Sequence, residues 1–212
     1  MKKTLLLFAI IYCNVIFAQQ TETNEKLIIE KKTWELGGSI RFGEGTGGAL
    51  ESQFAGGINR TSSFVVTATG GYAVLNNVIA GLNLGYFSIG VEDRNSNYYS
   101  VGTYVKLFKG VGKKTALNLQ TNFNYLFGKP REIDFRTNLP GNETSDYRSF
   151  TIAISPGLTY FISKKIAFNA SIGSLSYLSY KQENPDTSDF EGSDLRLSLS
   201  LSQVNLGLNI YL

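Results

Sequence analysis

The stretch 117-LNLQTNFNYLF-127 alternates largely apolar residues with polar ones along its length. Its odd positions run from Leu117 to Phe127. The even positions between them carry carboxamides, at Asn118, Gln120, Asn122 and Asn124. Because successive side chains of a strand point to opposite faces, this segment predicts a strand with one apolar face and one polar face. A soluble barrel buries such an apolar face inside, whereas a barrel in a membrane turns it outward.

The same alternation recurs along most of the chain and predicts about eight strands. We place them at 33–43, 62–74, 78–90, 99–107, 117–127, 147–162, 166–180 and 195–212. Three irregularities stand out within these segments, and one of them is a phase slip of the seventh segment near 174–180. Pro156 has no backbone donor and predicts a bulge or a local gap in the ladder. The alternation of the last segment changes phase near Ser202-Gln203, which indicates a β-bulge of one residue.

The connections between these segments alternate between long and short. This alternation is typical of outer-membrane barrels, which have long loops outside and short turns on the periplasmic side. The sequence therefore predicts an all-β protein, an eight-stranded antiparallel up-and-down transmembrane β-barrel. An even number of strands brings both ends of the barrel to the periplasmic side. Eight strands also enclose an interior narrow enough for side chains to fill.

The N-terminus reads as a signal peptide. Lys2 and Lys3 precede an apolar run over 5–17, and Ala18 offers a small residue for cleavage before Gln19. We therefore expect a signal peptide at 1–18, a flexible periplasmic lead-in at 19–32 and the barrel at 33–212. The single cysteine, Cys13, lies in the leader, so the mature chain is expected to hold no thiol and no disulfide.

Several kinds of chemistry are missing from this chain. It has no histidine, which excludes histidine-based nucleophilic triads and histidine metal sites. No pair of acids stands out on one strand face, and the glycine-rich stretch 43–48 lacks the helix that a dinucleotide site needs. We therefore predict no enzyme and no cofactor. Loss of Lys2 and Lys3 lowers the net charge from +3 to +1, so we expect no nucleic-acid partner.

The polar strand faces are predicted to line the lumen. The residues assigned to this lining are Glu35, Arg41, Tyr104, Lys106, Asn118, Gln120, Asn122, Asn124 and Arg196. Glu35 and Lys106 fall near the short-turn ends of their strands and are placed to pair across the interior, whereas Arg41 and Arg196 fall nearer the long loops. The lining can act as a selectivity filter or as a hydrogen-bonded plug, and the narrow interior favours the plug.

Aromatic residues gather at the predicted strand ends, as in the interfacial girdles of membrane barrels. The residues assigned to these girdles are Trp34, Phe42, Tyr72, Tyr99, Tyr125, Phe127, Tyr160 and Tyr211.

One hairpin carries a recognisable motif. It consists of 63-SFVVT-67, Gly70-Gly71-Tyr72, Asn76-Asn77, Ala80-Gly81-Leu82 and Gly85-Tyr86. It resembles the small outer-membrane β-barrel proteins of Bacteroidetes-type bacteria, with an OmpA/OmpX-like barrel. The resemblance implies a location in the cell outer membrane, with outer-membrane lipid and the barrel-assembly machinery as partners. The last residue, Leu212, departs from the aromatic residue that such barrels usually carry at this position.

Three functions remain open at this stage. The leading one is a structural or interaction protein of the outer membrane, whose surface loops contact the environment or an unknown protein partner. A second is a narrow pore or transport path for small solutes. A third is a soluble periplasmic or secreted barrel that binds an apolar ligand, which requires the apolar strand faces to point inward.

Overall fold

The computed structural model describes residues 26–45, 61–91, 94–129, 131–133, 140–144, 146–183, 190–198 and 204–212. The predicted signal peptide and its cleavage site at Ala18 and Gln19 lie outside this part of the chain. The described strands are β1 Trp34–Gly45, β2 Thr61–Leu75, β3 Val78–Val91, β4 Arg94–Gly110, β5 Thr115–Lys129, β6 Arg131–Ile133, β7 Pro140–Thr144, β8 Asp146–Phe161, β9 Ile166–Ile172, β10 Ser174–Glu183, β11 Phe190–Ser198 and β12 Val204–Tyr211. No helix in the described ranges is long and apolar enough to cross a membrane.

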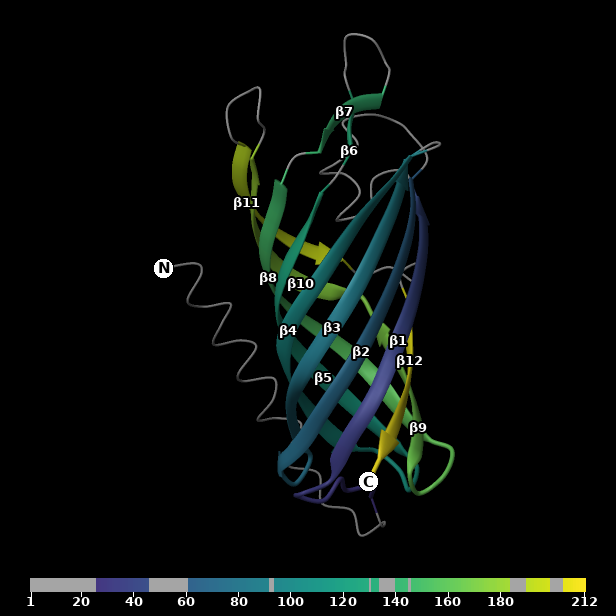
Figure 1. The fold of residues 1–212 in the computed structure, drawn as a ribbon. Coiled ribbons are helices and arrows are strands. Elements are labelled where there is room, and N and C mark those ends of the chain that lie inside the picture. The colour runs from purple at the N-terminus through teal and green to yellow at the C-terminus, as the bar shows by residue number, and fades with distance from the viewer. Residues whose placement is uncertain are drawn as a thin grey trace.

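All of these strands except β6 and β7 form one antiparallel sheet that closes on itself (Figure 1). Strands β1 to β5 and β8 follow one another around the wall, and β8 pairs with both β9 and β10. β9 and β10 are two parts of a seventh wall strand, and β11 and β12 are two parts of an eighth. The β1–β12 ladder closes the sheet from Glu35↔Tyr211 to Ile40↔Leu206. The predicted eight-stranded up-and-down barrel is therefore confirmed.

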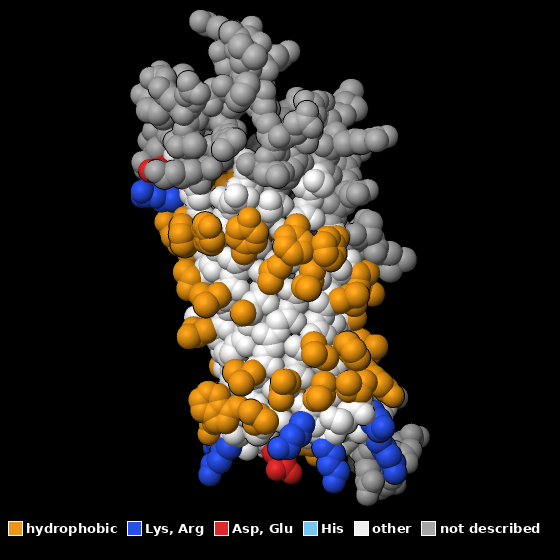
Figure 2. Space-filling model, turned by 45° about the vertical axis from the view of Figure 1, so that its right-hand side comes forward, with side chains coloured by type: hydrophobic (Ala, Val, Ile, Leu, Met, Phe, Trp, Pro, Cys, Tyr) orange, Lys and Arg blue, Asp and Glu red, His pale blue; other side chains and the backbone are white. Residues whose placement is uncertain are grey.

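The wall carries its apolar side chains on the outside. Along β4, Tyr98, Tyr104 and Lys106 are buried in the interior, whereas Val101 and Leu107, on the alternate positions, are exposed. Leu197 is 68 % exposed and Leu82 is 64 % exposed, although both are large aliphatic residues. On the face shown in Figure 2, hydrophobic side chains gather in an upper and a lower band. An apolar surface of this extent is stable in contact with hydrocarbon and not with water, so the wall has the distribution of a membrane-spanning barrel.

Aromatic side chains pack against one another on the outer surface at both levels of the wall. At the short-turn end the rings of Trp34 and Tyr72 lie 5.0 Å apart, edge to face. Toward the long-loop end Tyr99 contacts Phe127, with ring centroids 6.1 Å apart. One girdle assignment is wrong, because Tyr211 is buried inside the barrel. Tyr211 alternates with Ile210 and Leu212, which point outward, and it therefore belongs to the opposite face.

The irregularity predicted at Pro156 is present, and the extra residue lies on the neighbouring strand. β8 advances three residues between the pairs Gly157↔Ser171 and Ile154↔Leu175, while the seventh strand advances four. The seventh strand therefore contains a bulge, and Gly173 within it has a φ of 71°. A left-handed glycine is the usual solution at such a position. Pro156 lies on β8 opposite this interruption.

The phase change of the last strand involves more residues than predicted. Between the pairs Ser174↔Ser198 and Ile172↔Val204, the eighth strand advances six residues while the seventh advances two. The surplus is four residues instead of the single bulge residue expected near Ser202-Gln203, which itself lies outside the described residues. The seventh strand itself contains one extra residue here, so relative to a regular ladder the eighth strand has five extra residues. Any odd number of extra residues produces the same change of phase, so alternation alone does not give the size of the slip.

Strands also extend further toward the long loops than the sequence predicts. β4 begins at Arg94 instead of near residue 99, and β10 continues to Glu183. The predicted loop over 129–145 contains the short hairpin of β6 and β7. Strands that leave the hydrocarbon are solvated on both faces, so they continue to pair without the apolar alternation that marks them in sequence.

Candidate functional site

The structure places the nine predicted lining residues on inward strand faces. Glu35, Tyr104 and Lys106 are fully or almost fully buried, with exposed fractions of 0 %, 1 % and 4 %. The carboxamides of β5 are partly buried. Arg41 and Arg196 are also partly buried and lie further toward the long loops. The most deeply buried of the nine residues thus lie toward the short-turn end, and they include the buried acid and the buried lysine.

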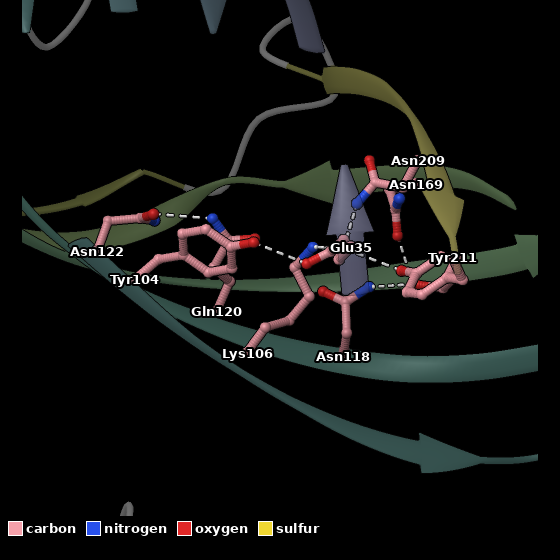
Figure 3. A network of polar contacts seen from close by, with 10 residues as sticks. Glu35, Tyr104, Lys106, Asn118, Gln120, Asn122, Asn169, Asn209 and Tyr211 are labelled. Atoms are coloured by element: carbon pink, nitrogen blue, oxygen red, sulfur yellow. Dashed lines mark hydrogen bonds and ion pairs between the residues drawn. The ribbon is translucent and has the colours of Figure 1, made fainter. Parts of the chain in front are cut away.

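The Glu35 carboxylate is the centre of this buried region (Figure 3). Lys106 Nζ donates to Oε1 over 2.6 Å, and Tyr211 Oη donates to the same oxygen over 2.9 Å. Tyr104 Oη donates to Oε2 over 2.8 Å, and Asn209 Nδ2 donates to Oε1. These donors come from β4 and β12, so the carboxylate on β1 connects strands on both sides of it. We refer to Glu35, Tyr104, Lys106, Asn209 and Tyr211 as the Glu35 network.

The charges in this network balance each other. Removing two ions from water costs several kcal/mol each, and the cost is offset only with good geometry and additional hydrogen bonds. Lys106 supplies the opposite charge, and its Nζ also lies 5.5 Å from the Tyr104 ring centroid and 5.7 Å from that of Phe108. Three neutral donors complete the coordination of the carboxylate. The Glu35 carboxylate is therefore neutralised and hydrogen-bonded within the network, and it is not exposed to a solute in the barrel.

Glycines on the facing strands make room for the network. A Cβ built on Gly71 would lie 2.4 Å from Tyr104 Oη, and one on Gly81 would lie 2.6 Å from Tyr104 Cε1. A Cβ on Gly37 would likewise overlap the carboxamide of Asn209. The large Tyr104 side chain therefore occupies space that β2 and β3 leave by carrying glycine, which is how a narrow barrel fills its interior.

Two shorter polar chains continue the filling next to the network. Asn118 Nδ2 donates to Thr159 Oγ1 over 2.8 Å, and Thr159 Oγ1 donates to Asn169 Oδ1 over 2.5 Å. This chain joins β5, β8 and β9. On β5 itself, Gln120 Nε2 donates to Asn122 Oδ1 over 2.8 Å. These bonds link inward side chains of neighbouring strands, or of one strand, beside the network.

The end of the barrel below the network is covered by the residues that precede β1. Ile29 N donates to Asn77 Oδ1 over 2.9 Å, and Asn77 N donates to Ile29 O over 2.8 Å. Leu27 N donates to Gly112 O in the β4–β5 turn over 2.9 Å. Ile29 is buried in an apolar cluster with Phe108, Phe161 and Tyr211 among its members. The described part of the predicted lead-in, 26–32, thus packs across the short-turn end.

Sequence reasoning assigned Glu35, Tyr104 and Lys106 to the lumen but did not include four residues that bond with them or beside them. These are Asn209, Tyr211, Thr159 and Asn169. Each alternates with outward apolar neighbours, so its odd or even position along the strand identifies the face on which its side chain lies. Their bonding partners come from other strands, and that information depends on the barrel's register, which the sequence does not contain.

Toward the long loops the buried interior is largely aromatic and apolar. Tyr98, Leu126 and Tyr147 form a second buried cluster, with Phe87 and Tyr180 packed against it. The Tyr98 and Tyr147 rings lie 5.6 Å apart, edge to face. On β11, Arg196 Nε donates to Asp194 Oδ2 over 2.5 Å. Among the described residues no three potential metal ligands gather at one place.

Comparison with known structures supports the fold. The crystal structure of Neisserial surface protein A (NspA) aligns with a TM-score of 0.52 and 9 % sequence identity, covering 84 % of this chain and 96 % of that one. The N-terminal β-barrel domain of Pseudomonas aeruginosa OprF aligns with a TM-score of 0.44 and 10 % identity, covering 87 % of this chain and all of that one. No protein-family model and no curated protein matches the sequence. At this identity, the NspA alignment supports the barrel architecture alone.

Proposed function

We propose that this chain is an outer-membrane barrel of structural or interaction type. Its interior is sealed near the short-turn end by the Glu35 network, and its long-loop end contacts the environment or a partner. The outward apolar wall supports membrane insertion, because a soluble ligand-binding barrel needs the opposite orientation of the same strands. A bacterial outer membrane is the usual setting for such a barrel.

The observation that carries this proposal is the burial of the Glu35–Lys106 ion pair in the barrel interior. Glu35 has an exposed fraction of 0 % and bonds to side chains from β4 and β12. A water-filled pore would leave such groups hydrated and exposed. At the short-turn end the interior instead consists of side chains bonded to one another, so the long-loop end is the part of the protein available for interaction.

Planar-bilayer recordings test the plug. Wild-type protein is expected to give no stable conductance. The variant Tyr104→Ala/Lys106→Ala/Tyr211→Ala removes most of the plug and is expected to give channel events. Arg196→Gln, nearer the long loops, is the control and is expected to stay silent. Stable conductance of the wild-type protein would favour the alternative of a narrow pore.

Cell fractionation tests the location. The protein is expected in the outer-membrane fraction and to migrate differently on a denaturing gel before and after heating, as folded barrels do. Recovery in the detergent-free soluble fraction would contradict membrane insertion and favour the ligand-binding barrel.

A further inference from the structure

The short-turn end of the barrel carries a concentration of lysines outside the Glu35 network. They lie before β1, at the end of β4 and in the β4–β5 connection, and in the β8–β9 turn: Lys26, Lys31, Lys32, Lys109, Lys113, Lys114, Lys164 and Lys165. All but the half-buried Lys109 are exposed. Among the described residues at this end, Glu30 is the one exposed acid, since Glu35 is buried. We call these eight residues the lysine rim.

Backbone hydrogen bonds show that the three groups of lysines are neighbours. Lys165 O accepts from Tyr211 N over 2.7 Å, and Leu212 exchanges hydrogen bonds with Trp34, two residues after Lys32. Lys114 O accepts from Phe161 N over 2.7 Å, which joins the β4–β5 turn to the end of β8. Leu27 N bonds to Gly112 O and brings Lys26 to the same turn. The lysine rim is therefore an arc around the barrel end.

The height of the lysine rim matches that of lipid headgroups. Lys164 follows the outward Ile162, which is 45 % exposed, by two residues, and Lys32 precedes the outward Trp34 by two residues. At about 3.3 Å per residue, both lysines begin within about 7 Å of the apolar wall. Figure 2 shows blue side chains directly below the lower orange band. Long lysine side chains at this level reach the membrane surface while their stems cover apolar surface.

We propose that the lysine rim binds the phosphate groups of anionic phospholipids in the adjacent leaflet. Charge complementarity favours this occupant, because positive side chains dominate the rim and each lysine near an anionic surface contributes to attraction. An arc at headgroup height fits lipids packed around the wall. This inference rests on the proposed membrane location, and it adds a preference for one class of lipid at one end of the barrel.

The only tryptophan of the chain, Trp34, reports on this rim directly. It is 56 % exposed and lies beside Lys32 and Lys165 through the contacts above. The full chain is reconstituted into bilayers of equal parts phosphatidylglycerol and phosphatidylcholine, with only one of the two brominated in each sample. Brominated chains quench tryptophan fluorescence on contact, so the two samples compare the lipids next to Trp34.

In the wild-type protein, quenching is expected to show a preference of about fivefold for phosphatidylglycerol over phosphatidylcholine next to Trp34. This factor is the gain in affinity expected from one lysine in contact with an anionic lipid surface. Lys32→Gln/Lys165→Gln is expected to lower this preference toward one, as is high salt. Arg148→Gln/Lys181→Gln removes two exposed charges at the long-loop end and is the matched control, which is expected to retain it.

Four results would overturn the inference, and the last of them would overturn the proposed function as well. Equal quenching by the two lipids in the wild-type protein would remove the preference while leaving membrane insertion intact. A preference that survives Lys32→Gln/Lys165→Gln would assign it to other residues. Equal quenching together with binding of soluble polyglutamate would assign the lysines to a polyanion in solution. Absence of quenching by either lipid would instead place Trp34 outside the bilayer and contradict the proposed function as well.

Discussion

Lys106 Nζ lies 2.6 Å from Glu35 Oε1, although 71 residues separate the two in the chain. The pair joins β4 to β1, which are not neighbours in the sheet because β2 and β3 lie between them. It is thus a contact across the interior of the barrel and not along its wall. With Tyr104, Asn209 and Tyr211 it connects strands from the first and last parts of the sheet and fills the short-turn end.

Removal of one charge of this pair is expected to destabilise the barrel more than removal of both. Glu35→Leu leaves the Lys106 ammonium buried without its counter-charge and is expected to cost about 3–5 kcal/mol of unfolding free energy. Glu35→Leu/Lys106→Met removes both charges and is expected to recover much of that loss. Denaturant unfolding in lipid or detergent, followed by gel mobility, measures the difference. Arg148→Met, at an exposed residue outside the lysine rim, is the control and is expected to change stability by less than about 0.5 kcal/mol. A double variant that is no more stable than Glu35→Leu would contradict this role.

Two adjacent glycines of β2 should respond oppositely to the same substitution. Gly71→Ala places a Cβ 2.4 Å from Tyr104 Oη and 2.8 Å from Ile79 Cγ2, and the overpacking is expected to cost about 1–3 kcal/mol. Gly70→Ala places its Cβ on the outside, 3.8 Å from Leu36 Cδ2, and is expected to be neutral or slightly stabilising. Thermal unfolding of both variants under identical conditions tests this. Tyr104→Phe in the Gly71→Ala background should restore part of the loss, and equal effects of the two alanines would rule out the proposed packing.

The sequence determines the faces of the strands more completely than their partners. The alternation over 117–127 correctly predicts the outward and inward sides of β5, and the parity of β1 and β4 places Glu35 and Lys106 inside. Their actual contact at 2.6 Å requires the register of β1, β2, β3 and β4 together. A strand pattern repeats every two residues, so it cannot distinguish one register from another shifted by two.

The sequence pattern is a poorer guide for residues whose position matches a common feature of membrane barrels but whose role differs. Tyr211 sits at a strand end, where aromatic residues commonly form girdles, yet it is buried and donates to Glu35. The number of extra residues in the eighth wall strand also differs from the prediction, because alternation shows only whether that number is odd or even. The part of the plug made by Ile29 was not foreseen, because a polar segment with isolated apolar residues has no periodicity that indicates packing.

The bulge of the seventh strand provides a backbone test. Gly173 has a φ of 71°, a conformation that costs alanine roughly 1 kcal/mol but that asparagine tolerates better. Gly173→Ala is therefore expected to lower the unfolding free energy by about that amount, and Gly173→Asn by less. Denaturant titration of the three proteins measures this ordering. Indifference to both substitutions would indicate that the seventh strand has no left-handed residue at this position.

Charges introduced on neighbouring residues of β5 should separate its two faces. Leu119→Lys places a charge on the lipid side of the wall, which is expected to cost about 2–4 kcal/mol near mid-membrane. Gln120→Lys places the same charge among the polar groups of the interior and is expected to cost less. Unfolding in lipid bilayers quantifies both variants. Equal or reversed costs would contradict the assignment of faces.

The most direct test of the account is a scan of β5 with single spin labels from residue 117 to residue 127. Only Cys13 must be replaced, because the chain contains no other cysteine. In bilayers, we predict that odd positions are accessible to oxygen dissolved in lipid and that even positions are shielded from it, with a period of two residues. Odd positions that respond instead to a water-soluble relaxation agent, in protein that stays dispersed without lipid or detergent, would contradict an outward apolar wall.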